Sequence, residues 1–147
     1  MQFNDTKMPV QSGKWEYLHK ESQNACAPVT VVAAGERSLL IAMTILYALQ
    51  KQGKSFDVVN ARFVKPLDVD CLREINSPHV ITIEDNVFLG GLGSMIAGEI
   101  VRMQKACTLK NFAYQDAFIT HGKVGELQEK YGVNSAEIQE YILKCLS

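Results

Sequence analysis

The sequence lacks the features of a secreted, membrane-anchored or metal-stapled protein. Its four cysteines stand more than thirty residues apart, with no CxxC or CxxxH pair, which excludes a zinc knuckle and favours small buried thiols in a reducing cytoplasm. The polar amino terminus has no apolar signal-peptide core, and no stretch reaches the roughly 18 to 20 apolar residues that span a bilayer. We therefore expect a cytoplasmic protein without a membrane anchor.

An excess of charge of either sign is also missing. Fifteen basic and sixteen acidic side chains give a net charge of −1 at pH 7, and there is no basic stripe or set of stacking aromatics. Nucleic acid and anionic membranes are therefore not expected as partners. With only four prolines, 8% aromatic and 47% hydrophobic residues, the composition indicates a packed domain rather than extended disorder.

The pattern along the chain indicates one domain. Residues 1–13 are polar and predict a mobile lead-in, and residues 14–147 predict a single folded unit. Strand-like apolar runs or alternations lie at 14–18, 28–35, 56–61, 79–84 and 108–114. Helical spacing predicts helices at 36–52, from Asp68 up to Ser77 and Pro78, and at 95–104, 124–131 and 136–145. Gly53 is expected to end the first helix and Ser135 to cap the last.

Strands and helices alternate through short connections. This pattern predicts an α/β fold, a three-layer α/β/α sandwich whose sheet has about five strands and is mostly parallel. Segment 14–18 reaches the next strand through a loop instead of a crossover helix. We therefore expect it to be an antiparallel edge strand.

Three unusual loops follow predicted buried strands. They are ARFVKPLD at 61–68, EDNVFLGGLGS at 84–94 and DAFITHG at 116–122. The carboxyl ends of parallel strands meet at one edge of a sheet, where ligands or partner surfaces gather. The function is therefore expected at this edge.

The glycine cluster of the second loop admits two interpretations. Gly90, Gly91 and Gly93 between a strand and a helix would let backbone N–H groups point at an anion. The cluster matches neither GxGxxG nor GxxxxGK[ST], so it lacks both the dinucleotide fingerprint and the Walker loop. The sequence favours the other interpretation, close packing against a neighbouring domain or subunit.

Charged side chains in these loops do not assemble a convincing active site. Glu84 and Asp85 end a strand, and paired carboxylates perform acid–base chemistry when burial raises one pKa. Arg62 and Lys65 are expected to pair with these acids across the edge, or else to hold a phosphate. His121 is a candidate general base or a structural group, but no GxSxG nucleophile accompanies it.

Taken together, the three loops resemble the carboxyl-terminal domain of the 1-deoxy-D-xylulose-5-phosphate synthases, thiamine-diphosphate enzymes related to transketolase. The resemblance covers roughly residues 10–145, and the DxFxxHG pattern at Asp116, Phe118, His121 and Gly122 points most narrowly to the synthases. It implies a transferase that decarboxylates pyruvate and joins the two-carbon unit to glyceraldehyde 3-phosphate.

The resemblance also implies that thiamine diphosphate and Mg²⁺ are held by two preceding domains. This sequence has neither the GDG…N diphosphate and metal motif nor the glutamate-bearing pyrimidine domain. We therefore expect no catalytic, cofactor-binding or metal-binding residue here, and no activity from the chain alone. The implied role is to pack on the thiamine-binding domains and to extend a homodimer interface.

Seven residues are candidates for that interdomain contact. Five match the motif positions, and two are apolar loop residues that would anchor the contact; the set is Arg62, Phe63, Glu84, Phe88, Gly91, Gly93 and His121. Two other interpretations remain open. The chain would be a subunit of a split transketolase-like enzyme, or an anion-binding regulatory module that uses residues 90–94 with Arg62.

Overall fold

The structure is a computed structural model that describes residues 11–87, 90–114 and 134–147. Five strands form one sheet in the order β1-β3-β2-β4-β5. Their bounds are β1 Glu16–His19, β2 Val29–Ala34, β3 Asp57–Asn60, β4 His79–Val87 and β5 Thr108–Tyr114. Strand β1 pairs antiparallel with β3, while all other pairs are parallel. The predicted mixed sheet and its antiparallel edge strand are confirmed.

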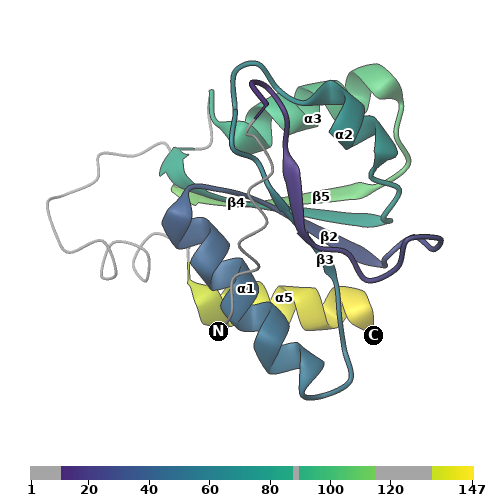
Figure 1. Ribbon diagram of the computed structural model, residues 1–147. Helices are drawn as coiled ribbons and strands as arrows, with labels where there is room; N and C mark the ends of the chain where they lie inside the picture. The colour runs from purple at the N-terminus through teal and green to yellow at the C-terminus, as the bar shows by residue number, and fades with distance from the viewer. Residues whose placement is uncertain (1–10, 88–89, 115–133) are drawn as a thin grey trace, which may run out of the picture.

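Helices cover both faces of this sheet (Figure 1). Helices α1 Glu36–Gln50 and α5 Ser135–Leu146 lie on one face, and α2 Val69–Glu74 and α3 Leu92–Met103 lie on the other. The predicted three-layer α/β/α sandwich is therefore confirmed.

The central strand β2 explains why its sequence is a continuous apolar run. Val29 and Val31 belong to the core beneath α1 and α5, whereas Val32 belongs to the core beneath α2 and α3. All three side chains are fully buried. A strand covered on both faces needs apolar residues at successive positions, because neither face meets water.

Boundaries near the carboxyl edge differ from the prediction. Strand β4 continues past Glu84, and Val87 pairs with Tyr114 beyond an irregularity in the register. Helix α3 begins at Leu92 instead of residue 95. The buried Leu92 continues the spacing of Ile96 and Ile100 into this first turn, but the glycines at 91 and 93 disfavour a helix by propensity and moved the predicted start past them.

The sequence of helix α1 places Leu39, Leu40, Met43, Leu46 and Leu49 at helical spacing, and all of them except Leu40 pack against the core. Leu46 and Leu49 are buried, but Leu40 is 58% exposed. Ser38 and Ala42 face the core instead, because small side chains let the helix approach the sheet. The helix ends at Gln50, and Gly53 follows it in the left-handed conformation, with φ of +73°.

Helix α5 corrects one predicted cap. Asn134, not Ser135, is the N-cap, because its side-chain oxygen accepts a hydrogen bond from the Ala136 N–H at 2.8 Å. The predicted helix at 124–131 and most of the predicted lead-in lie outside the described residues.

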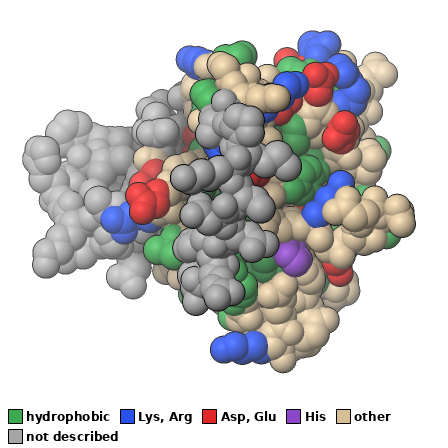
Figure 2. All heavy atoms as spheres, in the orientation of Figure 1, with side chains coloured by type: hydrophobic (Ala, Val, Ile, Leu, Met, Phe, Trp, Pro, Cys, Tyr) green, Lys and Arg blue, Asp and Glu red, His purple; other side chains and the backbone are tan. Residues whose placement is uncertain are grey.

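The visible surface agrees with the balanced charge of the sequence. On the described part of the face in Figure 2, acidic and basic side chains lie interspersed, without a large patch of one sign. Among the helices of the described ranges, none is both long enough and apolar enough to cross a bilayer.

Candidate functional site

The parallel strands bring two of the three predicted loops to the same edge of the sheet. ARFVKPLD begins directly after β3, and the glycine loop lies between β4 and α3. Strand β2 separates β3 from β4. The third loop, DAFITHG, lies outside the described residues, and so do Phe88 and His121.

The ARFVKPLD loop contacts the segment that precedes it in the chain. Arg62 forms an ion pair with Glu16, the first residue of β1, and the carbonyl oxygen of Phe63 accepts a hydrogen bond from the Trp15 indole N–H at 2.9 Å. The Arg62 side chain is 31% exposed and the Glu16 side chain 37%, so the pair stabilises the fold by less than about 1 kcal/mol. The expected pairing of Arg62 with Glu84 or Asp85 is wrong, because Glu16 lies beside Arg62 on the neighbouring edge strand.

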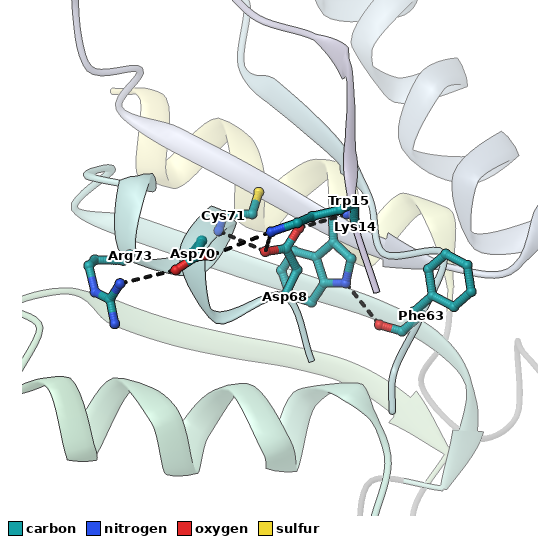
Figure 3. A network of polar contacts seen from close by, with 7 residues as sticks. All are labelled: Lys14, Trp15, Phe63, Asp68, Asp70, Cys71 and Arg73. Atoms are coloured by element: carbon teal, nitrogen blue, oxygen red, sulfur yellow. Dashed lines mark hydrogen bonds and ion pairs between the residues drawn. The ribbon is translucent and has the colours of Figure 1, made fainter. Parts of the chain in front are cut away.

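Asp68, the last residue of this loop, holds two elements together (Figure 3). Its Oδ1 accepts the Cys71 N–H at 3.0 Å and so caps α2, while its Oδ2 accepts the backbone N–H of Trp15 at 2.8 Å. The Lys14 ammonium lies 3.9 Å from Asp68 Oδ1 and 3.4 Å from Asp70 Oδ2. Asp68 is only 5% exposed, so its carboxylate relies on these donors.

Trp15 is the residue that sequence analysis missed at this edge. It is 9% exposed and belongs to the core beneath α2 and α3. The sequence placed Trp15 inside a predicted edge strand at 14–18, whereas β1 begins at Glu16, so the alternation of that segment did not reveal the burial of the indole. The signal that existed was its type, because it is the one tryptophan of the chain and a buried indole needs a partner for its N–H.

The N–H groups at the start of α3 are already occupied by the side chain of Glu84. Its two carboxylate oxygens accept the N–H groups of Leu92 at 2.9 Å and of Gly93 at 2.6 Å. These are the unpaired donors of the first turn of α3, which an external phosphate would otherwise contact. The sequence favoured close packing over an external anion at these N–H groups, and it gave no sign that a side chain of the same chain occupies them.

Burial governs the acidity of Glu84. The residue is 1% exposed, and loss of solvent raises the pKa of its carboxyl above the ordinary value of 4.5. The two backbone hydrogen bonds oppose this rise, because they stabilise the ionised form. The side chain is thus enclosed beneath the helix, while its neighbour Asp85 is partly exposed.

Gly93 is explained by contacts inside the domain. A Cβ atom at this position would clash with Asn111 Oδ1 and would lie 2.8 Å from Asn111 Cγ and 3.0 Å from Thr82 Oγ1. The glycine therefore lets α3 pack closely on β4 and β5. Gly91 is the N-cap of α3, with φ of −88°, a conformation that does not itself require glycine.

In the described ranges, no group of three or more His, Cys, Asp or Glu side chains is arranged to hold a metal ion. The two N–H groups that would best hold a phosphate are bonded to Glu84. At the described part of this edge, the N–H groups at the start of α3 are thus used in hydrogen bonds within the domain.

These features define an α/β domain whose motif loops organise one edge of a mixed five-stranded sheet. The chain belongs to the transketolase C-terminal domain family, whose sequence model, "Transketolase, C-terminal domain", matches residues 13–138. The family resemblance inferred from the loops is thereby confirmed.

Curated relatives of the chain are much longer proteins. The chain is 31% identical over 138 residues to the 1-deoxy-D-xylulose-5-phosphate synthase of Clostridium tetani, which covers 92% of this chain and 21% of that protein. It is 37% identical over 119 residues to the synthase of Carboxydothermus hydrogenoformans, with 80% and 19% covered. The chain thus spans about a fifth of the length of these relatives.

Solved structures agree on the fold. A split-gene transketolase, described as an inactive beta4 tetramer, matches with a TM-score of 0.79 at 25% identity, covering 95% of this chain and 44% of that one. The transketolase of Campylobacter jejuni matches with a TM-score of 0.57 at 20% identity, covering 90% and 18%.

Proposed function

We propose that this chain serves as the carboxyl-terminal domain of a 1-deoxy-D-xylulose-5-phosphate synthase. The observation that supports this most directly is the asymmetry of the match, which spans 92% of this chain but 21% of the C. tetani synthase. A domain of that size needs the remainder of the enzyme for chemistry. By resemblance, the whole enzyme condenses pyruvate with glyceraldehyde 3-phosphate on thiamine diphosphate and Mg²⁺ held elsewhere.

The role proposed for the domain is architectural. Glu84 and Gly93 act from inside, since one holds the first turn of α3 and the other lets that turn lie against β4 and β5. They would keep rigid the surface that carries Gly91 and, on the neighbouring loop, Arg62 and Phe63. Phe88 and His121 remain predicted contacts of the same interface.

The anion-binding alternative is not favoured. It required free N–H groups in residues 90–94 with Arg62 as a second ligand. Glu84 takes two of those N–H groups, and Arg62 pairs with Glu16.

A separate-subunit arrangement is the second candidate. The similarity to a split-gene transketolase supports it, because that chain is described as inactive in its beta4 form. In either arrangement we propose that the domain contacts thiamine-binding domains and contributes to a homodimer. Its four free thiols fit a reducing cytoplasm.

A chimera tests the proposal. This chain would replace the corresponding last fifth of the C. tetani synthase, and formation of 1-deoxy-D-xylulose 5-phosphate would be measured beside the intact synthase and a truncation that lacks the domain. We expect the chimera to recover activity that the truncation loses. A chimera that folds and assembles but is no more active than the truncation would overturn the proposal.

A further inference from the structure

A polar cavity of about 330 Å³ opens at the amino edge of the sheet, opposite the loops described above. Its rim includes residues 23–27, between β1 and β2, and residues 74–76, at the end of α2. The volume corresponds to about ten water molecules and lies at the small end of the range for ligand pockets.

Three buried polar side chains lie in a row across adjacent strands along this cavity. Asp57 in β3 is the register partner of Thr30 in β2, and Thr30 Oγ1 lies 2.6 Å from the hydroxyl of Ser77, just before β4. Their exposures are 6%, 1% and 3%. All three line the cavity.

The Asp57 carboxylate is only half satisfied within the described part of the chain. Its Oδ1 accepts the backbone N–H of Glu21 at 2.7 Å. Among the described residues the other oxygen has no hydrogen-bond partner, and no cation forms an ion pair with the carboxylate. This second oxygen is not among the buried polar atoms of the described residues that lack a partner. It is therefore open to the solvent of the cavity, where it can accept an N–H group from a ligand.

The charge of the cavity has the sign that attracts a cation. Asp57 and Glu74 contribute two carboxylates, against one ammonium from Lys20, which lies over the Tyr17 ring at 4.8 Å from its centroid. Burial first, and then the negative charges of Cys71, Asp57 and Glu74, raise the pKa of Tyr17 well above its ordinary value. Its phenol therefore stays neutral near pH 7.

We propose that this cavity binds a small hydroxylated primary amine. The ammonium would donate to the free oxygen of Asp57, and the hydroxyl of the ligand would reach the Thr30–Ser77 hydroxyl pair. The site is independent of the proposed enzyme function, since it lies at the other edge of the sheet and uses none of the motif loops.

Titration of the ¹⁵N-labelled chain with 2-aminoethanol tests the proposal, with the Glu21 amide as the reporter because it donates to Asp57. Saturable shifts of this amide and of the Thr30 amide are expected, with a Kd on the order of 1 mM for so small a ligand. Ethylene glycol, which lacks charge, and choline, which lacks ammonium N–H groups, are the matched probes. Both are expected to give no saturable shift at ten times that concentration.

Three variants complete the test. Asp57→Asn keeps an acceptor for Glu21 and is expected to weaken binding by at least tenfold. Glu74→Gln changes an exposed rim residue that does not threaten folding, and is expected to weaken binding roughly twofold to fivefold. Glu99→Gln, on α3 and paired with Arg102, is the control with unchanged binding. Absence of saturable shifts, equal binding of choline, or no weakening in either Asp57→Asn or Glu74→Gln would overturn the proposal.

Discussion

The close approach of α3 to the sheet makes Gly93→Ala a sharp test of the packing at this edge. The added methyl group would clash with Asn111 Oδ1, which accepts the Thr82 hydroxyl at 2.6 Å. Thr82 is completely buried and is the register partner of Asn111. The amide of Asn111 must therefore move, and the hydroxyl of Thr82 loses its acceptor.

The expected cost follows from these contacts. Overpacking costs about 1–3 kcal/mol, and a buried hydroxyl left without its partner costs a further 1 kcal/mol or so. Replacement of a helical glycine by alanine returns at most about 1 kcal/mol. We therefore expect Gly93→Ala to lower the free energy of unfolding by about 2 kcal/mol and Tm by roughly 4–8 °C.

Gly98→Ala is the matched control, because it lies in the same helix and a Cβ there meets no atom within 4 Å. It is expected to stabilise the domain by roughly 0.5–1 kcal/mol. Urea denaturation followed by circular dichroism measures both variants. The double variant Gly93→Ala with Asn111→Ala should cost at least about 1 kcal/mol less than the sum of its singles, because the clash with the Asn111 amide is gone and only the looser contact with Thr82 Oγ1 is left. Equal effects of the two alanines, or strict additivity with Asn111→Ala, would refute the reasoning.

Three further predictions concern ionisable groups. Because the folded pKa of Glu84 is raised, the stability of the wild type should fall as pH rises from 4.5 through that pKa. In urea titrations across this window, the free energy of unfolding of Glu84→Gln should therefore rise relative to that of the wild type. The opposite trend would contradict desolvation as the dominant cause of the shift. Asp68→Ala should lower the free energy of unfolding by roughly 2–4 kcal/mol, since it removes an N-cap and leaves a buried N–H unpaired. Asp70→Ala, at an exposed position, should change it by no more than about 0.5 kcal/mol in the same assay. Similar costs for the two variants would contradict the role assigned to Asp68. Burial raises the pKa of Cys71 to about 12. Iodoacetamide at mildly alkaline pH should therefore alkylate Cys71 far more slowly than the exposed Cys26, as measured by mass spectrometry. Comparable rates would show that the Cys71 thiol is not shielded.

The sheet could be predicted because its strands carry their burial in their composition. Val29, Val31 and Val32 are apolar in succession, as a doubly covered strand requires. The antiparallel edge strand could be predicted because a loop, and not a crossover helix, connects it to the next strand. The inward face of α1 was harder to predict, because the more hydrophobic Leu40 is exposed while Ala42 is buried. The small side chain of Ala42 lies where the helix meets the sheet.

The shared edge of two motif loops was predicted from the sequence, but the pairing of their side chains was not. Loops after β3 and β4 gather where a parallel sheet dictates, yet Arg62 pairs with Glu16 and not with Glu84. No local pattern reports that Glu84 reaches forward to Leu92 and Gly93. Such contacts depend on where the backbone turns, which side-chain periodicity does not encode.

The place of Trp15 in the fold has a consequence for synthesis on the ribosome. The carbonyl that binds its indole belongs to Phe63, 48 residues later in the chain. At roughly 5–20 residues per second, the tryptophan emerges roughly 2–10 s before its binding site exists. Strand β1, although made first, is therefore added to the sheet only after β2, α1 and β3 are available, and a nascent chain paused before Phe63 would present this indole to chaperones.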